Sequence, residues 1–190
     1  MRGRMNLDSE WGAIDNAIVL FYMAVIWFCC ALTGDPEAPA ASILIFICGF
    51  ALIKPLIRLL KNGLRSKKPV HANTQLLLSC LTLGTATGLV PVFFSFINNP
   101  IFFFIAFSAI QGFLMLAVWK SIGQISIIIT GILLVVNAGY QFFNESSDFN
   151  HISLGAALIC LFFSGYSRLQ PILSRALSTS KRDKALSTGS

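Results

Sequence analysis

The sequence predicts an all-α polytopic membrane protein, a bundle of six transmembrane helices with short loops. Hydrophobic residues make up 55% of the 190 residues and charged residues only 12%, and the mean hydropathy is +0.74. Soluble domains have about 25% charged residues, so lipid is expected to surround most of this chain. The apolar residues form continuous runs, whereas the strands of a membrane barrel would alternate apolar and polar residues.

An apolar run needs about 20 residues to cross the bilayer as a helix. The runs in this chain are 17–33, 40–57, 74–97, 101–119, 124–143 and 152–169. The third, fourth and fifth runs reach this length or nearly do, and the other three are at its short end. Lys54 and Arg168 complete the inner ends of the second and sixth runs, because their long side chains can place the charged group at the membrane surface.

The basic residues indicate the orientation. All 14 Lys and Arg residues fall within four expected inner segments or the helix ends beside them; the segments are 1–16, 58–73, 120–123 and 170–190. The expected outer loops contain four acidic residues and no Lys or Arg; they are 34–39, 98–100 and 144–151. Basic segments stay on the cytoplasmic side, so both termini are expected there, and an odd number of crossings would contradict the pattern. In a bacterium the membrane would be the plasma (inner) membrane.

The chain is therefore expected to have three parts. Residues 1–16 form a cytoplasmic N-terminal segment, 17–169 the six-helix domain, and 170–190 a charged, Ser- and Thr-rich cytoplasmic tail that is disordered. Small residues up to Ala31 leave open that the first helix is a signal peptide cleaved at that point. The long leader with three acidic residues before residue 17 argues against cleavage.

A basic amphipathic stretch, 54–68, follows the second run. Its cations are spaced 4, 3, 4 and 3 residues apart, which places them on one helical face; they are Lys54, Arg58, Lys61, Arg65 and Lys68. Leucines occupy the opposite face, and Pro55 suits the first turn of a new helix or a kink. The pattern is typical of an interfacial helix that contacts anionic lipid headgroups on the cytoplasmic side. The alternative is that the charges only determine topology.

The third run contains a sequence that alters helix packing. Gly84 and Gly88 form a G-x-x-x-G pair, which lets another helix approach closely. Pro91 has no N–H to donate to the carbonyl of Thr87, one turn earlier. The two alternatives are a tight helix crossing and a locally broken helix that lines a cavity.

Several uncharged polar residues lie at mid-membrane depth. They are Thr85, Thr87, Ser108 and Gln111, with Asn137 nearer the outside. Such side chains are expected to face the interior of the bundle, because lipid offers them no partner. They either join helices by hydrogen bonds or line a small polar site or pore.

Catalytic, cofactor and metal sites are not expected. No Asp or Glu lies inside a run, and His71 and His151 are placed on opposite sides of the membrane. The five cysteines fall inside apolar runs and are interpreted as packing residues. The net charge of +6 lies beside apolar runs, which indicates lipid headgroups rather than nucleic acid as the partner.

Two function classes remain for a multi-pass protein of this kind. One is a small transport-related protein, that is, a channel, permease or membrane-embedded substrate-binding subunit, and the polar mid-membrane residues favour it. The other is a non-catalytic structural or assembly subunit of a larger membrane complex, and the lack of charged groups inside the runs favours that. An intramembrane enzyme ranks last, because no nucleophile, base or metal constellation is present. Partners would be the bilayer itself, other membrane proteins or further copies of this chain.

Overall fold

A computed structural model describes residues 2–33, 40–63, 72–96, 100–122, 124–144 and 149–187. In these ranges the chain is all-helical, with seven helices and no strand. They are α1 (Arg2–Thr33), α2 (Ala40–Ala51), α3 (Ile53–Gly63), α4 (Ala72–Phe96), α5 (Pro100–Ile122), α6 (Ile125–Phe143) and α7 (Phe149–Ser187).

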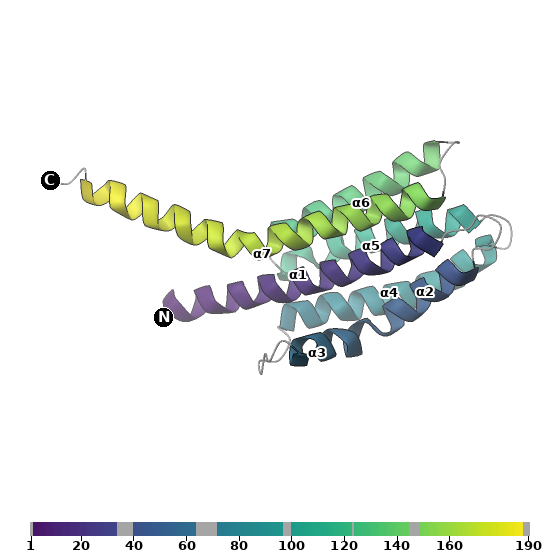
Figure 1. Ribbon diagram of the computed structural model, residues 1–190, viewed down its shortest axis with the longest axis horizontal. Coiled ribbons are helices and arrows are strands. Elements are labelled where there is room, and N and C mark those ends of the chain that lie inside the picture. The colour runs from purple at the N-terminus through teal and green to yellow at the C-terminus, as the bar shows by residue number, and fades with distance from the viewer. Residues whose placement is uncertain are drawn as a thin grey trace.

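The helices lie side by side in one elongated bundle, and both termini leave it at the same end (Figure 1). We call this the termini end. The most extensive contact joins α1 and α7, the first and last helices, which run antiparallel. Helix α5 packs between α4 and α6, and α2 packs on α1. Continuous apolar segments form helices in lipid because a helix satisfies its own backbone hydrogen bonds.

Four of the helices contain a segment long and apolar enough to cross a membrane. The segments are Gly12–Thr33, Ile101–Trp119, Ile125–Phe143 and Asn150–Gln170. The bent pair α2 and α3 adds a fifth if it is one broken span. The structure thus supports a membrane-embedded helical protein with four or five crossings. The remaining expected run, 74–97, coincides with α4, of which Thr74–Ala86 is an apolar segment shorter than a full span.

The second expected run is broken rather than continuous. Helix α2 ends at Ala51 and α3 begins at Ile53, with a bend of 64° between their apolar parts. Pro55 explains the position of the break, because it cannot donate to the carbonyl of Ala51 and its ring crowds that carbonyl. The helical ladder resumes at once, with the Leu56 amide donating to the Leu52 carbonyl at 3.0 Å.

Both terminal helices extend further than expected from the sequence. Helix α1 already begins at Arg2, and α7 continues to Ser187 through the tail that we expected to be disordered. At 39 residues α7 is about 58 Å long, roughly twice the thickness of the hydrocarbon layer. Residues 172–187 contain no Pro or Gly and several strong helix formers, so nothing in the sequence ends the helix there.

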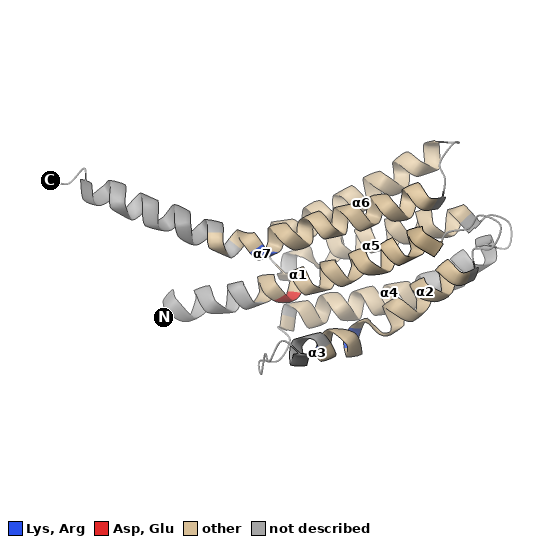
Figure 2. Cartoon of the chain, viewed as in Figure 1, with Lys and Arg blue, Asp and Glu red and all other residues tan. Residues whose placement is uncertain are grey.

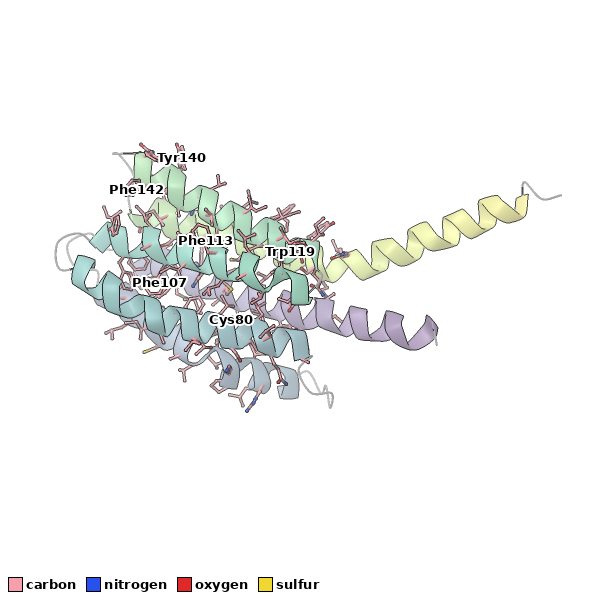
Figure 3. All side chains as sticks on the ribbon, turned by 180° about the vertical axis from the view of Figure 1, so that it is seen from behind. Cys80, Phe107, Phe113, Trp119, Tyr140 and Phe142 are labelled. Atoms are coloured by element: carbon pink, nitrogen blue, oxygen red, sulfur yellow. The ribbon has the colours of Figure 1, made fainter. Side chains whose placement is uncertain are left out.

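The charged side chains that the structure describes gather toward the termini end. Among the residues that Figure 2 describes, Lys, Arg, Asp and Glu appear only on α1, α3 and α7 near that end. Aromatic residues mark both ends of the apolar wall: Trp119 lies toward the termini end, and Tyr140 and Phe142 lie toward the other (Figure 3). These three side chains are exposed, as is typical of aromatic residues at the two membrane interfaces.

An aromatic cluster forms the centre of the bundle between α1, α2 and α5. Its six members are fully buried: Trp27, Phe46, Phe50, Phe103, Phe104 and Phe107. The centroids of contacting rings are 4.7–6.2 Å apart, mostly edge to face. Lipid tails are as apolar as these side chains, so the cluster stabilises the bundle through packing and ring geometry rather than through exclusion of water.

Candidate functional site

Trp27 of the aromatic cluster is one half of a buried polar pair. The indole Nε1 of Trp27 on α1 donates to Oε1 of Gln111 on α5 at 3.0 Å, and neither side chain is exposed. Trp27 belongs to the core-facing stripe of α1, in which Leu20, Met23 and Cys30 are also buried. Gln111 lies one residue from the middle of the span Ile101–Trp119. The pair therefore joins two helices near the middle of the membrane.

The amide nitrogen of Gln111 has a different environment. Because Oε1 accepts from the indole, the orientation of the amide is set and Nε2 points away from Trp27. This nitrogen is buried and has no hydrogen-bond partner among the described residues. A buried donor without an acceptor costs about 1–3 kcal/mol. The site therefore contains a hydrogen-bond donor that the surrounding protein does not satisfy.

Three of the other polar residues expected at mid-depth bond to main-chain carbonyls. Ser108 donates to the carbonyl of Leu134 at 3.1 Å, which joins α5 to α6. Asn137 donates to the carbonyl of Ile152 at 3.3 Å, which joins α6 to α7. Thr85 is buried and donates to the carbonyl of Leu81 in its own helix. Gln111 and Asn137 thus face different neighbours, α1 and α7, and the structure does not bring them together.

The glycine pair of α4 is described only at its first member. A Cβ atom built at Gly84 would collide with the side chain of Leu114, so α5 lies close against this glycine. The side chains of Thr87 and Pro91, and the surroundings of Gly88, lie outside the described part of α4.

Comparison with known proteins adds no relationship. No protein family, curated protein or solved structure matches this chain. A function for this chain must therefore be inferred from the chemistry of its own side chains.

Helices α5 and α6 cross at two glycines that the sequence analysis missed. A Cβ atom at Gly112 would lie 2.6 Å from the carbonyl oxygen of Gly131, and one at Gly131 would lie 2.9 Å from that of Gly112. The backbones are therefore in direct contact. A G-x-x-x-G motif is visible within one helix, whereas this crossing takes one glycine from each of two helices, so no local spacing signals it.

A hydrogen-bonded network at the termini end was also missed. Asn16 accepts from Thr74 on α4 at 2.9 Å and donates to Gln124, just before α6, at 2.9 Å. The neighbouring Asp15 is also buried. Asn16 was assigned to the segment before the first run, where a polar residue needs no partner. The network joins three parts of the chain that are at least 50 residues apart.

Small hydroxyl side chains continue this network between α6, α7 and α1. Ser167 donates to the hydroxyl of Ser126 at 2.7 Å, and Ser164 donates to the carbonyl of Ala17 at 2.8 Å. All these hydroxyls are buried. They are small enough to let the helices pack closely while they form hydrogen bonds across the contacts.

Helix α3 presents a basic face outside the bundle. Lys54 and Arg58 are exposed, whereas Ile53 and Ile57 are fully buried. The sequence pattern predicts leucines in lipid, on the face opposite the cations, and Leu59 is 63% exposed. Ile53 and Ile57 are the residues that pack on the bundle. The side chain of Lys61 and the residues Arg65 and Lys68 lie outside the described part of the chain.

The five cysteines differ in how far they are buried. Cys30 and Cys160 are buried, Cys29 and Cys80 are half-buried, and Cys48 is exposed. The thiol of Cys30 lies 3.4 Å from the carbonyl of Ser42 on α2. Within the described residues, no group of three or more His, Cys, Asp or Glu side chains is placed to hold a metal ion.

Proposed function

We propose that this chain crosses its membrane six times, with both termini in the cytoplasm; in a bacterium this would be the plasma (inner) membrane. Support comes from the termini, which leave the bundle at one end (Figure 1), and from the charges gathered there (Figure 2). An even number of crossings is needed for both features. The 25-residue helix α4 supplies about 37 Å, enough to cross the hydrocarbon layer as the further span.

Labelling of single cysteines in intact cells tests this topology. Cysteines placed at Asp35, Asn99 and Asp148 are expected to react with an impermeant reagent, and those at Lys67 and Lys120 only after the membrane is opened. The reason is that basic loops stay on the cytoplasmic side. Reaction of position 120 from outside would contradict six crossings, because it would reverse the central loop.

We further propose a non-enzymatic role in transport, as a small channel, permease or membrane-embedded substrate-binding subunit. One observation carries this proposal: Gln111 is wholly buried near the middle of its span, and its Nε2 has no acceptor among the described residues. A polar group is costly in that position, and the bond to Trp27 uses only the carbonyl oxygen of the amide, which leaves the nitrogen for another partner. Such a donor would offer a hydrogen bond to a polar solute that crosses the bundle.

Reconstitution in vesicles tests the transport role. Vesicle swelling in glycerol or acetamide, and release of K⁺ or Cl⁻, are expected to exceed those of protein-free vesicles for at least one solute. The alternative is a structural or assembly subunit. It is favoured by Ser108 and Asn137, whose hydrogen bonds join neighbouring helices. No flux for any solute, together with partners that co-purify at fixed stoichiometry in mild detergent, would favour the subunit.

We also propose that α3 binds anionic headgroups through Lys54 and Arg58, continued along the sequence by Lys61, Arg65 and Lys68. The exposed cations beside the buried Ile53 and Ile57 support this, because the bundle holds the helix with its charged face outward.

A spin label at position 59 of the full-length protein tests the lipid contact. The label is expected to be shielded from a water-soluble quencher in vesicles with anionic lipid, and more accessible in Arg58→Glu or at high salt. Arg168→Glu, at an exposed arginine of α7, is the matched control and should leave the label shielded. Shielding that does not depend on anionic lipid would make the headgroup proposal wrong.

A further inference from the structure

The donor in the proposed site is well defined. Nε2 of Gln111 is buried and unpartnered among the described residues, and the Trp27 hydrogen bond determines which way the amide is turned. Lipid tails and aromatic rings offer no conventional acceptor. The two N–H groups of this nitrogen therefore need an oxygen from another source.

The neighbouring helix α4 contains a carbonyl whose regular helical donor is missing. Pro91 lies inside α4 and lacks an N–H, so the main-chain carbonyl of Thr87 loses the donor that a regular helix would supply. Near the middle of a membrane such a carbonyl needs a donor from elsewhere.

The register of α4 and α5 brings these two groups to the same level. The two helices are consecutive, pack against each other, and place Gly84 against Leu114. In antiparallel helices, three residues forward from Gly84 correspond to three residues back from Leu114, which pairs Thr87 with Gln111. Residues three apart also share a helix face. Thr87 and Gln111 are therefore at the same level along the contact of α4 and α5.

We propose that Gln111 Nε2 and the Thr87 carbonyl together bind a small uncharged molecule that both accepts and donates a hydrogen bond, of the amide, urea or alcohol class. This inference rests on the transport role proposed above and names its substrate class. The described charged residues, Asp15, Lys54, Arg58 and Arg168, lie toward the termini end, so an ion at Gln111 would have no counter-charge among them. A neutral ligand avoids that cost.

Trp27 reports on the site directly. Binding at Nε2 polarises the Gln111 amide and strengthens its bond to the indole, which shifts the indole N–H resonance. In Trp11→Phe/Trp119→Phe protein Trp27 is the only one of the three tryptophans left. Acetamide, acetone, acetate and guanidinium have similar shapes but differ in charge and hydrogen-bonding groups. We expect a saturable shift with acetamide, a weaker response to acetone, and none with acetate or guanidinium.

Two substitutions test the two halves of the site. Gln111→Leu should abolish the saturable response. Pro91→Ala restores an N–H for the Thr87 carbonyl and should weaken acetamide binding about 5- to 10-fold, the loss of one neutral hydrogen bond, while leaving acetone binding unchanged. Pro91→Ala also removes a helix breaker, so it remains informative if Gln111→Leu does not fold. Gly139→Ala, at an open position of α6, is the control and should bind as the parent does.

The outcomes separate this inference from the transport role. A folded protein whose Trp27 signal ignores acetamide, or responds equally to acetate or guanidinium, overturns the inference. So does a Pro91→Ala protein with unchanged acetamide binding. A saturable, Gln111-dependent shift without acetamide flux in vesicles supports the site and rejects transport. Ion flux without the shift supports transport and rejects the site.

Discussion

Replacing Trp27 with alanine is expected to destabilise the bundle by about 3–5 kcal/mol. The side chain is fully buried and contacts Phe46 and Phe104 edge to face, at centroid distances of 5.0 and 6.2 Å. Its removal leaves a cavity between α1, α2 and α5 and also takes the hydrogen bond from Gln111. The free energy of unfolding, measured by titration of SDS into mild detergent, reports the effect.

Two companion variants separate packing from hydrogen bonding. Trp27→Phe keeps an aromatic ring but removes the N–H, so we expect a smaller loss of about 1–2 kcal/mol. Trp119→Ala removes a 40% exposed tryptophan at an interface position and should cost less than Trp27→Ala. Equal losses for Trp27→Ala and Trp119→Ala would mean that the aromatic cluster does not stabilise the bundle.

The second large effect is expected at the glycine crossing of α5 and α6. Gly112→Ala places a methyl group 2.6 Å from the Gly131 carbonyl oxygen, a backbone atom that cannot rotate away. The helices must separate, which should lower the free energy of unfolding by about 1–3 kcal/mol. The same titration in detergent measures this change.

Gly139→Ala is the matched control for this prediction. It lies on the partner helix α6, and a Cβ atom there meets nothing within 4 Å. Alanine favours helix over glycine by about 1 kcal/mol, so this variant should be neutral or slightly more stable. Opposite signs for the two substitutions are therefore expected. If both stabilise, the close backbone contact at Gly112 does not exist in the membrane.

The break between α2 and α3 could be predicted from a local pattern, but the packing of α3 could not. Pro55 alone predicts a kink or a new helix, since a missing N–H and a ring clash act one turn away. The face on which α3 packs did not follow from the pattern. The pattern placed the leucines opposite the cations and in lipid, whereas the burial of Ile53 and Ile57 depends on how the bent pair of helices packs against its neighbours.

The polar residues show the same division. Gln111 was expected to face the interior, because burial of an amide in lipid is costly wherever it occurs along a helix. Its partner could not be predicted, since Trp27 lies 84 residues away and the indole N–H of a tryptophan does not always bond to a protein acceptor. Asn16 was missed for a related reason: a residue next to an apolar run looks solvated until α4 and the segment before α6 fold over it.

The sequence by itself determined that this is a helical, membrane-embedded chain with its basic residues in alternate loops. Hydropathy, run length and charge are local properties of the sequence, so each can be assessed without knowledge of the fold. Only the tertiary structure decided the Gly112–Gly131 crossing, the Trp27–Gln111 pair and the contact of α1 with α7. These depend on the rotation and register of helices far apart in sequence, which are set by the packing of many side chains together and by no single local pattern.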